Sequence, residues 1–176
     1  MSTEPISAAD DPAFRAWLRV LSDELDTDLA DYLDSPEVLG FLWATFTRNG
    51  ATPAARFAPL LCTHRRVLAD RTVAALLAQV RRDTGRALDV PVFCEPPSGR
   101  EPTGRLAVGN ERVRGVDPVD ISVETAEGVQ CFLADRDHLV WPLCPDHGVA
   151  PHATRTPAGA AWFCSVTSHV VGLLPS

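Results

Sequence analysis

The chain has no lysine, so all 16 basic side chains among its 176 residues are arginines, against 23 acidic ones. Alanine, valine, proline and aspartate are abundant, a composition typical of GC-rich coding, and we assign this bias no function. The formal net charge of −7, without a long basic patch, disfavours binding driven by phosphate contacts. The pairs Arg65-Arg66 and Arg81-Arg82 are expected on the solvated face of a helix. We therefore expect no nucleic-acid partner.

Membrane and secretion signals are also missing from the sequence. No apolar run approaches the roughly 20 residues that a helix needs to cross a bilayer. The N-terminus lacks the charged start, apolar centre and small-residue cleavage site of a secretory signal. The five cysteines are an odd number, which argues against a complete disulfide framework. These absences predict a cytoplasmic, reduced protein with no membrane partner.

The first half of the sequence has the pattern of a small helical bundle. Apolar side chains recur every three or four residues between Phe14 and Tyr32. Ser35-Pro36-Glu37 predicts the start of a second helix, which ends at Asn49-Gly50. We expect a short third helix from Thr52-Pro53, and a separate fourth helix that begins after residues 62–64 and ends at Gly85. The bundle is predicted to span residues 11–87, after a flexible N-terminus at 1–10.

The second half, residues 88–176, reads as β-rich. Ala-Glu-Gly between Ile121–Thr125 and Val129–Ala134 predicts a β-hairpin. The sequence therefore predicts an α+β fold, with the helical bundle packed on a C-terminal antiparallel β region. The two parts form either separate domains or one continuous domain. Further strands are expected at Val90–Phe93, Arg105–Val108, Leu139–Leu143, Ala160–Cys164 and Val170–Leu174.

The stretch Trp141–Leu174 carries the main candidate for chemistry. It contains a C-x2-H pair, Cys144 and His147, followed by a C-x4-H pair, Cys164 and His169. Each pair is expected on a tight turn, so that two side chains point at one ion. Thiolate and imidazole are the ligands that zinc prefers in closed tetrahedral sites. The spacing predicts a structural zinc site in a zinc-ribbon-like hairpin module.

Two alternatives to this ligand set are open from the sequence. His152 can replace His169 as the fourth ligand. Without a metal, the same stretch reads as a hairpin whose cysteines are small core residues, since buried free cysteine behaves as a small hydrophobe.

Other cysteine and histidine combinations give weaker hypotheses. Cys62-Thr63-His64, taken together with the first zinc pair, has the C-x-H and C-x2-H-G halves of a Rieske cluster, although the first half lies in the helical region. A nucleophilic Cys62, Cys94 or Cys131 with His64 or His138 as base is the other possibility, but no local signature marks a nucleophile. Gly-rich phosphate loops, H-E-x-x-H and G-x-S-x-G motifs are absent.

Acidic residues gather on the far face of the first helix and just beyond it, with no basic residue between them. We interpret this face as solvated, with a docking surface for a basic protein partner as the alternative. Its members are Asp23, Glu24, Asp26, Asp28, Asp31, Asp34 and Glu37.

At Trp141–Leu174 the chain resembles a C-terminal module of small actinobacterial proteins with no assigned activity. The resemblance is carried by Trp141–His147, by Trp162-Phe163-Cys164 and by Val170–Leu174. It implies a turn and two strands, and it carries Cys144, His147 and Cys164 over as site residues. It does not extend to His169.

The leading functional prediction is a non-enzymatic, zinc-stabilised binding or accessory protein. The first alternative is a small zinc enzyme, in which three protein ligands leave a position for water and Asp146 or Glu127 assists as an acid. The second is a metal-free acidic interaction protein.

Overall fold

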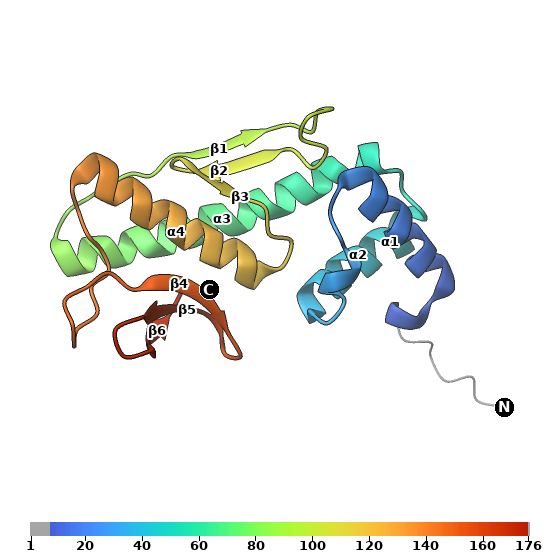
Figure 1. Cartoon of the computed structure of the whole chain (residues 1–176). Coiled ribbons are helices and arrows are strands. Elements are labelled where there is room, and N and C mark those ends of the chain that lie inside the picture. Colours follow the sequence, from blue (N-terminus) through green and yellow to red (C-terminus); the bar gives the residue numbers. More distant parts are fainter. Residues whose placement is uncertain (1–7, 176) are drawn as a thin grey trace. The chain divides into compact units, whose positions relative to one another are not determined.

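A computed structural model describes residues 8–175 of the chain (Figure 1). Four α-helices and two antiparallel three-stranded sheets make up the described part, so the predicted α+β fold is confirmed. The predicted flexible segment 1–10 falls mostly on residues outside this part, and Ala8–Asp10 forms a 3-10 turn, η1. The other elements are α1 (Pro12–Leu25), η2 (Ala30–Tyr32), α2 (Pro36–Asn49), α3 (Ala54–Thr84), β1 (Val92–Glu95), β2 (Arg105–Val108), β3 (Glu111–Val113), α4 (Pro118–Asp137), β4 (His152–Thr156), β5 (Gly159–Cys164) and β6 (His169–Leu173).

The chain groups into two compact units. Unit 1 comprises residues 1–62 and 96–104, and unit 2 comprises residues 63–95 and 105–176. The predicted boundary at residue 87 rests on composition, and it stays a prediction. None of the helices described between residues 8 and 175 has the length and apolarity needed to cross a membrane.

In unit 1, helices α1 and α2 begin at the capping residues that the sequence predicted. The Asp11 carboxylate accepts a hydrogen bond from the Phe14 amide at 2.8 Å, and Ser35 caps α2 in the same way. Pro12 and Pro36 occupy the first helical positions, where no amide donor is needed. A cluster of aromatic rings fills the interior, and its members are Phe14, Trp17, Trp43, Phe46 and Phe57.

Unit 2 places helices between two sheets, as Figure 1 shows for α3 and α4. The sheet β1–β2–β3 and the sheet β4–β5–β6 both contact α4. Alternate residues of β2 and β4 face a common core that includes Leu106, Val108 and Ala153. Arg155 on β4 pairs with Asp120 on α4 at 2.9 Å, which ties the second sheet to the start of that helix.

Helix α4 occupies the segment for which a hairpin was predicted, and that prediction is wrong. The missed signal is Asp117-Pro118, because the Asp117 carboxylate caps the helix at the Val119 amide, 2.8 Å away. Gly128 was taken for a turn residue, but it lets α4 approach β2. A Cβ atom at Gly128 would lie 2.7 Å from the Val108 carbonyl oxygen.

Three further features also differ from the prediction. Helix α3 runs without a break through residues 62–64, since none of these residues ends a helix. Arg65, expected on a solvated face, is 3 % exposed and donates hydrogen bonds to the carbonyls of Gly115 and Arg114 at 2.8 and 2.6 Å. Residues 139–143 form a loop instead of a strand, and buried Trp141 in this loop donates its indole N–H to Asp83 at 2.9 Å.

The packing of Gly128 gives a test with a matched control. Gly128→Ala is expected to lower the free energy of unfolding by about 1–3 kcal/mol, because the added methyl group overlaps the Val108 carbonyl. Gly40→Ala in α2 adds a methyl group that meets no atom within 4 Å, and it should stabilise by about 0.5–1 kcal/mol. Urea unfolding followed by circular dichroism measures both changes. Equal effects of the two substitutions would contradict the close approach of α4 to β2.

Candidate metal centre

The first two candidate ligands lie on a tight turn between α4 and β4. The Cys144 carbonyl accepts hydrogen bonds from the amides of His147 and Gly148 at 3.3 and 2.8 Å, and the Cys144 amide donates to Val149 at 2.8 Å. Gly148 has a φ of +66°, a conformation that glycine adopts without strain. This closed turn points the Cys144 and His147 side chains to one side.

The other two candidate ligands close the β5–β6 hairpin. Cys164 ends β5 and His169 begins β6, and the two are direct cross-strand partners. Ser168, with a φ of +54°, completes the turn that connects them. The C-x4-H spacing is therefore that of a hairpin end, at which cross-strand neighbours have Cβ atoms about 4.5–5.5 Å apart.

The two turns bring all four side chains together. One ligand atom from each of Cys144, His147, Cys164 and His169 lies within 4.8 Å of the other three. The His147 Nδ1 atom is 3.3 Å from the Cys144 Sγ and 3.5 Å from the Cys164 Sγ. The His169 Nε2 atom is 3.5 Å from the Cys144 Sγ. These residues are therefore close enough to hold one metal ion.

The distances suit a tetrahedral ion. Metal–sulfur bonds of about 2.3 Å and metal–nitrogen bonds of about 2.05 Å place sulfur and nitrogen roughly 3.6 Å apart in a tetrahedron. The three sulfur–nitrogen distances, 3.3 to 3.5 Å, lie close to that value. Both cysteines are buried, and both histidines are partly exposed. The site thus has its soft sulfur ligands on the interior side and its imidazoles toward solvent.

A hydroxyl group lies against the ring of the fourth candidate ligand. The Thr167 Oγ1 atom lies 2.8 Å from the His169 Nδ1 atom, and the His169 Nε2 atom faces the cluster. With the proton on Nδ1, the imidazole donates to Thr167 and keeps the Nε2 lone pair for a metal. The pattern C-S-V-T-S-H did not mark Thr167 as functional, because only the hairpin turn brings the hydroxyl to the ring.

Asp146 lies at the exposed side of the cluster. One of its carboxylate oxygens is 3.6 Å from the His169 Nε2 atom, and its side chain is 70 % exposed. Glu127, the other acid considered from the sequence, lies on α4 outside the group of four. Burial raises the pKa of Glu127, and the charge of Glu124 raises it further.

His152 lies apart from the four candidate ligands. Its ring stacks edge-on against Phe163, its partner on β5, with the ring centroids 5.4 Å apart. The structure therefore groups His169, and not His152, with the other three residues. Cys62 and His64, the first half of the Rieske hypothesis, lie on α3 and are not members of the group.

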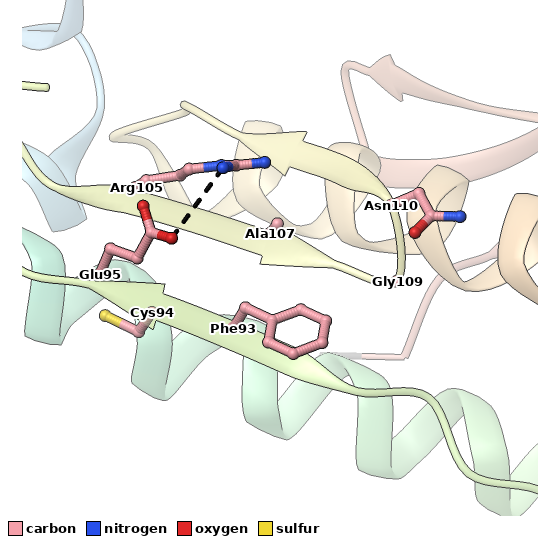
Figure 2. A pocket seen from close by; sticks show the side chains of 7 residues that line it. All are labelled: Phe93, Cys94, Glu95, Arg105, Ala107, Gly109 and Asn110. Atoms are coloured by element: carbon pink, nitrogen blue, oxygen red, sulfur yellow. Dashed lines mark ion pairs between the residues drawn. The ribbon is translucent and has the colours of Figure 1, made fainter. Parts of the chain in front are cut away.

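Cys131, one of the cysteines outside the group of four, lacks the features of an activated nucleophile. Burial raises the pKa of Cys131, and the charges of Glu111 and Asp135 add to the rise, so its thiolate is disfavoured. Cys94 lines a hollow of about 290 Å³ beside strands β1 and β2 (Figure 2). Figure 2 also shows Glu95 and Arg105 there, an ion pair with 4.0 Å between its charged atoms.

Contacts with the core hold the loop that carries the first turn. Trp141 packs edge-on against Trp162 of β5, with the ring centroids 6.1 Å apart, and its indole N–H donates to Asp83 of α3. At the far end of the loop, the Gln130 side chain donates to the Pro151 carbonyl at 2.8 Å. The turn is thus fixed on both sides against α3, α4 and β5.

No family model, no curated protein and no solved structure matches this chain. The resemblance to the actinobacterial module accordingly stays a prediction.

The contact between Thr167 and His169 predicts a graded effect on metal affinity. Thr167→Val removes the hydroxyl and keeps the shape, and it should weaken zinc binding by about tenfold, since outer-shell partners typically contribute 10–100-fold. Thr167→Ser keeps the acceptor and should retain the affinity of the unchanged chain. Competition with a chromophoric zinc chelator measures the dissociation constants. Equal affinity of the valine and serine variants would show that the hydroxyl does not orient His169.

Proposed function

We propose that Cys144, His147, Cys164 and His169 bind one zinc ion, which closes the β4–β6 module of a non-enzymatic binding or accessory protein. The observation that carries the proposal is the meeting of four ligand atoms within 4.8 Å from two separate turns. Two thiolates and two imidazoles form the mixed set that favours tetrahedral zinc over magnesium or calcium, which prefer oxygen ligands.

The proposed role is structural for an energetic reason. Strands β4 to β6 contain only five or six residues each, and the sheet ends in exposed turns. Structural zinc contributes about 10–16 kcal/mol of apparent binding free energy in small domains, and this energy supports folding when the site forms only in the native chain. Four protein ligands also leave no open coordination position for a substrate.

Metal content and its link to folding test the proposal. Protein prepared without a chelator is expected to contain about one zinc per chain by elemental analysis. Stripping the ion should expose the segment after residue 138 to protease, because the two turns lose their common ligand. Absence of zinc, or a stripped chain with unchanged protease resistance, would contradict the structural role.

Cysteine variants provide the matched comparison. Cys144→Ser and Cys164→Ser should each abolish stoichiometric zinc and lower the thermal midpoint. Cys94→Ser and Cys131→Ser, outside the group of four, should retain one zinc per chain. Loss of zinc in the second pair would place the metal elsewhere.

One observation favours a second candidate, a zinc enzyme with an open position. The exposed Asp146 carboxylate lies beside His169, where an acid could assist a water molecule if His169 were not a ligand. His169→Ala separates the two candidates. The structural site predicts weakened zinc and a loosened β5–β6 turn, whereas the enzyme predicts one zinc per chain and an intact fold.

A further inference from the structure

The acidic side chains are divided unevenly between the two units. Unit 1 contains 11 acidic residues and five arginines, a net charge of −6, and unit 2 contains 12 acidic residues and 11 arginines, a net charge of −1. Between Arg19 and Arg48 the sequence has no basic residue. The acidic segment, defined as Asp23, Glu24, Asp26, Asp28, Asp31, Asp34 and Glu37, lies in that interval, and all seven side chains are exposed.

None of these seven carboxylates takes part in an ion pair recorded within residues 8–175. The acidic segment begins in the last turn of α1, where the helix dipole adds partial negative charge. Unit 1 therefore offers concentrated negative charge that the described part of the chain does not neutralise.

An apolar groove opens beside Glu24, a member of the acidic segment. Its volume is about 460 Å³, and Glu24 and Ser98 are the polar residues of its lining. Leu25 of α1 and Ala54 and Ala58 of α3 are buried at 3 %, 5 % and 1 % exposure, and the exposed Ala55 lies beside them. Pro97 and Pro102, from the loop between β1 and β2, complete the apolar lining.

The alanines explain the shape of the groove. The lining positions on α3 hold side chains of one carbon, which leaves space between two helices and a proline-containing loop. An apolar side chain of a ligand can enter this space, while cationic side chains of the same ligand reach the acidic segment. Apolar anchors flanked by complementary charge are the usual way in which a short segment is recognised in a groove.

We propose that this groove binds a basic segment of a partner protein, with an apolar side chain in the groove and arginine or lysine side chains against the acidic segment. Charge complementarity decides the occupant. Nucleic acid is repelled by a unit of net charge −6, and a second copy would bring two acidic segments together. The proposal does not depend on the metal centre, whose ligands all lie in unit 2.

Selection from a random peptide library displayed on phage tests the proposal. The full chain is immobilised, and Ala55→Trp protein, whose indole fills the groove, serves for counter-selection. Enriched peptides are expected to combine arginine or lysine with apolar residues. Their affinity, measured by fluorescence anisotropy, should fall about tenfold between 50 and 500 mM NaCl, because salt screens exposed charges. Failure to enrich peptides over the counter-selection, or enrichment of acidic peptides, would overturn the proposal.

Two pairs of variants measure separately how the groove and the acidic segment contribute to peptide affinity. Ala55→Trp should weaken the selected peptide at least tenfold, whereas Ala78→Trp, at an exposed position of α3 in unit 2, should not. Glu24→Gln with Asp26→Asn should weaken binding severalfold and flatten its salt dependence, and Asp89→Asn with Asp135→Asn is the control in unit 2. Asparagine tolerates the left-handed conformation of Asp26, whose φ is +49°. Binding unaffected by either groove or charge variant would overturn the proposal.

Folding and self-association are checked on the same proteins. Thermal unfolding identifies a misfolded Ala55→Trp variant, in which case Ala55→Leu, a smaller filling, replaces it. Sedimentation velocity tests whether the unchanged chain forms a dimer through the groove. We expect no dimer that is lost in the Ala55→Trp variant. Such a dimer would make a second copy the occupant and would overturn the assignment to a basic partner segment.

Discussion

Helix α4 packs against both sheets of unit 2, and the fold of this unit depends on that packing. A sheet of three short strands is stable only when one face is covered by apolar side chains from another element. Strands β2 and β3 contact α4 from one sheet, and β4 and β5 contact it from the other. The absence of a side chain at Gly128 permits the first contact, and the pairing of Arg155 with Asp120 supports the second.

The candidate metal centre lies at the end of the second sheet, beside the turn between β5 and β6. The β5–β6 hairpin contacts the core through Trp162 and Ala160, while residues 165–168 of its turn are exposed. Two thiol and two imidazole groups from the two turns converge there. In our proposal the ion connects the two turns and adds to the packing of Trp141 against Trp162, since structural zinc contributes folding free energy in small domains.

The two units differ in charge as well as in architecture. Unit 2 is nearly neutral and carries the candidate metal centre, while unit 1 carries most of the net negative charge and an apolar groove. This separation suits an accessory protein in which one unit supplies a stable framework and the other a surface for a basic partner. Under this proposal the metal and the partner bind different units, so each can be removed without the other.

The sequence by itself determined the helix starts at Asp11-Pro12 and Ser35-Pro36 and the α+β class, because caps and turns act over a few residues. It also determined the candidate ligands Cys144, His147 and Cys164, with His169 or His152 as the fourth. Tertiary structure decided what depends on distant contacts. Gly128 was predicted in a turn, but it lies on α4, where the close approach of β2 requires a glycine. Arg65 was predicted on a solvated face, but it is buried and donates hydrogen bonds to the carbonyls of residues 114 and 115. The choice of His169 over His152, and the role of Thr167, likewise followed from hairpin pairing, since His152 faces Phe163 and His169 faces Cys164.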